Sequence, residues 1–129
     1  MIVVDTNVIS YFLIRGERSE SIDRLYKADS DWVAPRLWID EFLNVLATYE
    51  RLNKLASSET APIFADALAL MEGSTYEVPA DRILSIARRT SCSAYDSQYI
   101  ALAEDRGLQF YTCDKKILRA CPSIAVEPE

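Results

Sequence analysis

The chemistry available to this chain has to come from carboxylates, because the sequence contains no histidine. That absence excludes Ser-His-Asp and Cys-His triads, histidine general bases and zinc sites that need an imidazole ligand. Two acids follow short apolar runs: Asp5 comes after Ile2–Val4, and Asp114 comes after 110–113. If both runs are parallel strands, these acids lie at the carboxyl edge of a sheet, where α/β proteins bind ligands. Each acid also precedes a helical pattern, so each can instead serve only as a helix N-cap.

A third acid, Glu41, lies at the boundary of a buried helix face. In the helix predicted over 37–52, a rotation of about 100° per residue gives a core stripe. That stripe consists of Ile39, Phe42, Leu43, Leu46 and Tyr49. Glu41 falls beside it among apolar side chains, whereas Asp40 falls among basic ones. Because an unpaired charge against apolar groups is costly, Glu41 is the better site candidate. The alternative is a half-exposed helix acid without a special role.

Asp96 occupies the apolar row of its predicted helix. The residues at i+3, i+4 and i+7 are Tyr99, Ile100 and Ala103, so a charge there needs a partner. The segment from Ser93 to Asp96 also fits a capping box, in which the carboxylate only bonds backbone N–H groups. The two roles are compatible, because a helix N-terminus favours an ionised acid.

Four converging carboxylates repel one another and therefore require a cation. Oxygen ligands without imidazole or thiolate suit a hard ion, Mg²⁺ or Mn²⁺. Such ions polarise phosphodiesters and activate water. We therefore expect metal-assisted phosphodiester chemistry at Asp5, Glu41, Asp96 and Asp114.

The elements that position these acids alternate between short apolar runs and helical patterns. Strands are expected at 1–4, 32–34, 76–78, 108–112 and 124–126. Helices are expected at 6–14, 19–28, 37–52, 57–71, 80–90, 94–106 and 115–120, with an αα-hairpin between the second and third strands. Alternating strands and helices predict an α/β fold with a mostly parallel sheet of about five strands. With 129 residues and no linker or repeat, the chain is expected to form one domain, 1–129.

Composition narrows the cellular setting. The 14 basic and 20 acidic side chains give a formal charge of −6, which argues against a sequence-independent DNA coat. The three cysteines lack a CxxC spacing and are expected to be reduced. The N-terminus does not read as a signal peptide, and no apolar run approaches the roughly 20 residues of a membrane helix. We expect a cytoplasmic protein without membrane contact.

Several ordered segments together resemble the PIN-domain nucleases. These are MIVVDTNV at 1–8, DEFLNVL at 40–46, SAYDSQYIALA at 93–103, GL at 107–108 and YTCDKK at 111–116. Among PIN proteins, the short chain looks most like the VapC toxins of toxin–antitoxin pairs. The resemblance implies a PIN-like α/β/α sandwich and a metal-dependent endoribonuclease that uses Mg²⁺ or Mn²⁺. It also implies a homodimer inhibited by a cognate antitoxin.

Residue by residue, the resemblance maps Asp5, Glu41, Asp96 and Asp114 onto the acidic quartet of the family. We expect Asp5, Asp96 and Asp114 to ligate the principal ion, and Glu41 to ligate it or to bond its waters. Asn7 and Thr112 match supporting polar positions, with Asn7 orienting Asp5 or a water. The expected reaction is in-line cleavage of RNA by metal-activated water, leaving a 5′-phosphate and a 3′-hydroxyl.

Phosphate contacts require cations near these acids. The candidates are Arg15 after the first helix, and Lys115 and Lys116 beside Asp114. Lys116 is the strongest of them, because a lysine in a first helical turn opposes the helix dipole. The alternative for each is an ordinary solvated side chain.

Two other functional classes stay open. A non-catalytic binding module can keep the fold and the four acids. A Mg-dependent phosphatase of the haloacid-dehalogenase type also begins with an acid after its first strand, but it needs a second acid where this chain has Asn7.

Overall fold

Five short parallel strands form one sheet in the order β3-β2-β1-β4-β5. The computed structural model describes residues 1–129. The strands are β1 (Ile2–Val4), β2 (Trp32–Pro35), β3 (Thr75–Tyr76), β4 (Phe110–Tyr111) and β5 (Ala125–Val126). In the register between β1 and β4, Val4 is opposite Tyr111. The segments that follow these two strands therefore leave the sheet side by side at its carboxyl edge.

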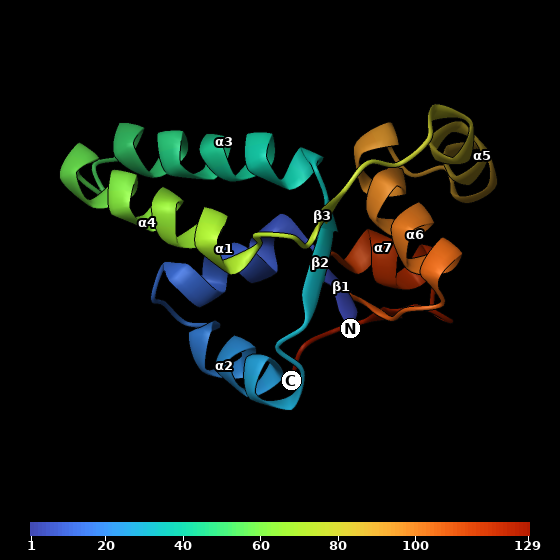
Figure 1. Cartoon of the computed structure of the whole chain (residues 1–129), viewed down its shortest axis with the longest axis horizontal. Helices are drawn as coiled ribbons and strands as arrows, with labels where there is room; N and C mark the ends of the chain where they lie inside the picture. The colour runs from blue at the N-terminus through green and yellow to red at the C-terminus, as the bar shows by residue number, and fades with distance from the viewer.

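Seven helices cover the two faces of this sheet (Figure 1). They are α1 (Thr6–Leu13), α2 (Ser19–Ala28), α3 (Leu37–Arg51), α4 (Ser57–Leu70), α5 (Ala80–Thr90), α6 (Ala94–Arg106) and α7 (Lys115–Ala120). In Figure 1, α1–α4 lie on one side and α5–α7 on the other, with α3 and α4 running as a hairpin. The predicted α/β/α sandwich is confirmed. None of the helices combines the length and apolarity needed to cross a membrane.

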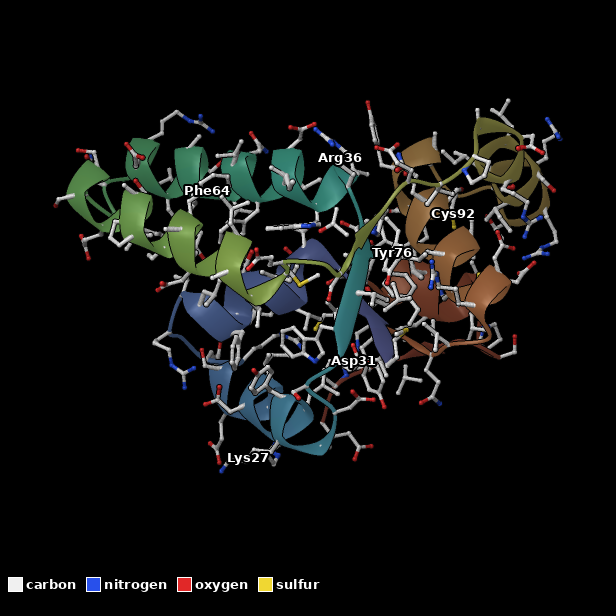
Figure 2. The ribbon with its side chains drawn as sticks, viewed as in Figure 1. Lys27, Asp31, Arg36, Phe64, Tyr76 and Cys92 are labelled. Carbon is white, nitrogen blue, oxygen red and sulfur yellow. The ribbon has the colours of Figure 1, made fainter.

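The core fills the space between the sheet and both helical layers. Figure 2 shows Phe64 on the α4 side and Cys92 on the α5–α6 side of the sheet. On α3 the fully buried row is Trp38, Phe42 and Leu46. The predicted core position of Leu43 is wrong, because 44% of this residue is exposed. The i, i+4, i+8 row faces inward because α3 packs against β2, α1 and α4 together, which rotates the buried stripe toward Trp38.

Capping residues mark the start and the end of α6 at the positions that the sequence predicts. Ser93 accepts the N–H of Asp96 at 3.0 Å at the start of α6, and Gly107 ends that helix with φ of 66°. Four of the five strands are shorter than expected, whereas β2 extends one residue further, to Pro35. Leu108 donates its N–H to Ala103 in the α6 cap, so β4 begins only at Phe110. Pairing of β3 stops at Tyr76 because α3 begins at Leu37 and leaves no further β2 partner.

Candidate active site

Asp5 ends the first strand segment and caps α1, and only 9% of the residue is exposed. Its Oδ1 accepts the N–H of Val8 at 3.0 Å, and its Oδ2 accepts the hydroxyl of Thr112. Burial raises the pKa of Asp5 from 3.8 to about 6; the bonds from Thr112 and Val8 oppose the rise, and the charges of Glu41 and Asp114 add to it. Capping of α1 uses only Oδ1 of Asp5. It does not explain why the other oxygen, Oδ2, is bonded to Thr112 inside the protein.

Thr112 links the two acids at the strand ends. Its hydroxyl donates to Asp5 and accepts the N–H of Asp114 at 3.0 Å. Asp114 is exposed and caps α7 with its Oδ1, which accepts the N–H groups of Lys116 and Ile117 at 2.8 and 3.3 Å. The Oδ2 of Asp114 makes no hydrogen bond within the protein. The fully buried Thr112 thus ties the carboxylate of Asp5 to the backbone of Asp114.

Glu41 is held by two hydroxyls from other elements. Tyr99 OH donates to Glu41 Oε1 at 2.6 Å, and Thr6 Oγ1 lies 3.0 Å from the same oxygen. Thr6 and Tyr99 are also 2.8 Å apart, so two hydroxyl protons serve three contacts. Burial, and then the charge of Glu41, raise the pKa of Tyr99 well above its usual range, so the phenol keeps its proton and donates it. Both donors converge on Oε1, which leaves Oε2 without a protein partner.

Sequence reasoning missed Thr6 and Tyr99. Helical periodicity places Tyr99 on the apolar row of its helix, and it is indeed buried and stacked on Phe110. The available signal was the phenol itself, because the hydroxyl of a buried tyrosine usually finds a hydrogen-bond partner. The sequence did not show which residue that partner is.

Replacing Tyr99 with phenylalanine tests this clamp. Tyr99→Phe keeps the stacked ring but removes the shorter bond to Glu41, so the free energy of unfolding is expected to fall by about 1–3 kcal/mol. Urea denaturation at neutral pH measures the loss. Tyr111→Phe is the control, because Tyr111 is half-buried and its hydroxyl makes no hydrogen bond. Equal losses in the two variants contradict a specific bond to Glu41.

Asp96 is half-buried at the third residue of α6. Burial raises its pKa above the usual range, the charges of Asp114 and Glu41 add to that rise, and Ser93 and Lys116 oppose it. The Ser93 hydroxyl accepts the N–H of Asp96, which is one half of the predicted capping box. The effects of Asp114 and Glu41 show that acids from three different helical segments influence one another electrostatically.

One cavity of about 550 Å³ gathers all four predicted acids. Its walls come from α3, from the first half of α6, and from the starts of α1 and α7, which follow β1 and β4. The lining residues are Asp5, Thr6, Asn7, Leu37, Asp40, Glu41, Asn44, Val45, Tyr95, Asp96, Tyr99, Asp114 and Ile117. The cavity therefore opens at the carboxyl edge of the sheet, as the strand-end acids predict. Asp40 also borders it, but as an exposed side chain that makes no hydrogen bond.

The remaining candidates have different surroundings. Asn7 is exposed in the cavity and makes no hydrogen bond to Asp5. Arg15 pairs with Asp23 at 2.9 and 2.6 Å, and Lys115 pairs with Glu127 at 2.8 Å. Lys116 makes no ion pair, and its charge lowers the pKa of Asp96. Among the three predicted cations, Lys116 is thus the one free to meet an anion at the cavity.

The donor groups suit a hard divalent ion that keeps part of its water shell. No three or more acidic, histidine or cysteine side chains are arranged to hold one ion, so the expected cage of three aspartates is not preformed. Mg²⁺ is commonly held by one or two carboxylates together with water. The partner-free Oδ2 of Asp114 and Oε2 of Glu41 are suitable oxygens, and the cavity offers no imidazole or thiol. The residues therefore fit a hydrated Mg²⁺ or Mn²⁺.

The fold, together with the carboxylates at the carboxyl edge of its sheet, is typical of the PIN domains. Comparison of the sequence with models of protein families gives the same result. Residues 2–121 match the model of the PIN domain family. The chain belongs to the PIN domain family. No curated protein matches the sequence.

Several solved structures share this fold. One is PAE2754 from Pyrobaculum aerophilum, with a TM-score of 0.76 and 22% identity over 96% of this chain and 81% of the other. FitAcB from Neisseria gonorrhoeae has a TM-score of 0.69 and 22% identity over 99% and 98%. A toxin–antitoxin complex from Klebsiella pneumoniae has a TM-score of 0.64 and 14% identity over 100% and 98%. At these identities the likeness concerns the fold.

Proposed function

We propose that this chain is a metal-dependent endoribonuclease. The observation that carries the proposal is the single cavity at the carboxyl edge of a PIN domain, lined by Asp5, Glu41, Asp96 and Asp114. These acids come from separate elements, and burial and mutual repulsion raise the pKa of Asp5 and of Asp96. Proteins rarely keep such carboxylates together without a positive ligand, because each charge disfavours the others.

The chain's own groups supply binding and orientation. Because no cage of three acids is preformed, Asp5, Asp96 and Asp114 would hold the ion either directly or through its bound waters, and Glu41 would hold it or its waters. When bound, the divalent ion supplies charge neutralisation at the scissile phosphate and activates water. Thr112 holds the carboxylate of Asp5 and the backbone of Asp114 in place, while Thr6 and Tyr99 direct Glu41. Because these hydroxyls bond the carboxylates of Asp5 and Glu41, these two side chains are oriented before the substrate arrives.

Cleavage of RNA by the purified chain is the direct test. With Mg²⁺ or Mn²⁺, the protein is expected to cut RNA and leave 5′-phosphate and 3′-hydroxyl ends, which end-labelling and ligation identify. DNA of the same sequence is the comparison. If calorimetry shows that the ion binds and yet no RNA is cut, the chain is a binding module that has kept the fold.

The proposal extends to a toxin with a cognate antitoxin. Support comes from the fold shared with FitAcB and with a toxin–antitoxin complex. Two further properties proposed with it are a homodimer and a cytoplasmic location. Induced expression should arrest growth, and Asp96→Asn should relieve the arrest. A small neighbouring gene whose product binds this chain and restores growth is the expected antitoxin, and growth unaffected by the parent chain contradicts the toxin role.

The free lysine beside Asp114 provides a prediction about RNA affinity. Lys116→Gln is expected to weaken RNA binding. The slope of log affinity against log salt should become less negative by about 0.7, the value for one contact to a single strand. Lys115→Gln is the matched control, because Lys115 is already paired with Glu127. Filter binding in Ca²⁺ or without a divalent ion, at several salt concentrations, measures both slopes. Identical slopes for the two variants exclude a specific contact by Lys116.

A further inference from the structure

Tyr95 is the only exposed aromatic side chain of the protein, with 63% of the residue exposed. The other tyrosines are buried or half-buried; for example, Tyr26 packs on Phe12 and Trp32, and Tyr76 lies under Arg106. The ring of Tyr95 contacts no other aromatic ring or cation, and its hydroxyl makes no hydrogen bond. Burial within the protein therefore does not account for this side chain.

Its position is nevertheless fixed by a rigid element. Tyr95 is the second residue of α6, a helix whose start is held by the Ser93 cap. The next residue is Asp96, one of the four acids. A tyrosine presents a large flat face and has only two side-chain torsions to immobilise, so it loses little entropy when a ligand covers it. The helix thus anchors an exposed aromatic side chain directly beside the proposed metal ligands.

The same cavity provides the surroundings that a flat heteroaromatic group needs. Leu37, Val45 and Ile117 are apolar lining residues, and Asn44 contributes an exposed amide that can both donate and accept. A volume of about 550 Å³ lies within the range of sites for small ligands, so one nucleotide can enter beside the acids.

We propose that Tyr95 stacks on an unpaired nucleobase of the RNA strand whose phosphate reaches the acids. This inference rests on the proposed ribonuclease function and specifies its substrate class as single-stranded or looped RNA. In an A-form duplex each base is already covered by its neighbours, whereas an unstacked base can lie on an aromatic side chain. Every base has a face that can stack, so Tyr95 supplies affinity and position, and a polar neighbour such as Asn44 can supply preference.

Substitutions at Tyr95 test the stacking. Tyr95→Ala is expected to raise KM for a looped RNA by about 5- to 150-fold, the loss of one base–aromatic stack. Tyr95→Phe and Tyr95→Trp are expected to stay near the parent value, because both keep a flat ring. Leu84→Ala, which removes an exposed apolar side chain outside the cavity, is the control and should change nothing. Loss with Tyr95→Phe as well shows a role for the hydroxyl and overturns the stacking proposal.

An abasic scan identifies the base. The parent and Tyr95→Ala are compared on RNAs in which one nucleotide near the cut lacks its base. At a single position the penalty of Tyr95→Ala should disappear, because the stack is already lost. The same cut sequence placed inside a duplex should be cut poorly by both proteins.

The outcomes separate the two levels of the proposal. If the parent cuts no RNA, the proposed function fails. If the parent cuts RNA and Tyr95→Ala cuts it with an unchanged KM, only the stacking subsite fails. If Tyr95→Ala leaves cleavage unchanged but shifts the oligomeric state in sedimentation, the exposed ring belongs to a protein interface, and the nucleobase proposal is overturned. Melting curves of the variants should match the parent, since an exposed ring contributes little to folding.

Discussion

Asp5→Asn is expected to lower RNA cleavage by at least about two orders of magnitude and, at the same time, to stabilise the metal-free protein. The loss follows because the amide carries no charge for a divalent ion. The gain follows because burial raises the pKa of Asp5 to about 6, so at neutral pH the folded protein carries an ionised group that it disfavours. A rise from 3.8 to about 6 corresponds to up to about 3 kcal/mol at 1.36 kcal/mol per pKa unit.

The sign of the pH dependence follows from the raised pKa. The folded state binds the Asp5 proton more tightly than the unfolded state, so the parent loses stability as pH rises from about 4 to about 6. Above that range the penalty is constant. Asp5→Asn lacks this titration, so its advantage over the parent should be small at pH 4 and largest at pH 7.

Urea denaturation in chelator at both pH values measures the effect on stability, and RNA cleavage in Mg²⁺ measures the effect on activity. Asp40→Asn is the matched control, because Asp40 is an exposed acid at the same cavity and makes no hydrogen bond. It is expected to change both quantities little. An Asp5→Asn variant that cuts RNA at the parent rate would exclude Asp5 from the metal site.

Removing divalent ions is expected to stop cleavage and to lower the unfolding temperature by roughly 10 °C relative to saturating Mn²⁺. Binding at 100-fold above the dissociation constant contributes about 2.7 kcal/mol, which is of that order for a chain of this length. The physical source is relief of the cost of burial and repulsion, since burial and then the charges of Asp114 and Glu41 raise the pKa of Asp96.

Thermal unfolding with and without Mn²⁺, together with cleavage in EDTA, measures this prediction. Asp114→Asn should lose most of the stabilisation by the ion, because the substitution removes the negative charge from the side chain whose Oδ2 has no protein partner. Glu20→Gln is the control, since Glu20 is exposed on α2 and does not line the cavity. A stabilisation that is the same in the parent and in Asp114→Asn places the ion outside this cavity.

Local features were readable from the sequence because they depend on neighbours along the chain. The starts of α6 and α7 follow from Ser93 and Asp114, whose side chains bond N–H groups two or three residues ahead. The alternation of elements predicts an α/β/α fold, and the acids after β1 and β4 predict a site at the carboxyl edge. Each of these inferences needs only helical periodicity, capping and the geometry of parallel strands.

The tertiary structure decided which distant groups meet. The sequence places Tyr99 on an apolar row of its helix. Only the fold shows that α6 and α3, on opposite faces of the sheet, bring the hydroxyl of Tyr99 onto Glu41, 58 positions away in the chain. Pairing of Lys115 with Glu127 depends on β5 lying beside β4, and it leaves Lys116 as the free cation. The sequence by itself determined the types and approximate places of the acids. Packing between elements decided which partners these acids have, how deeply they are buried and that no metal cage is preformed. Contacts between elements join residues that are far apart in the sequence, and no periodic pattern along the chain signals such pairs.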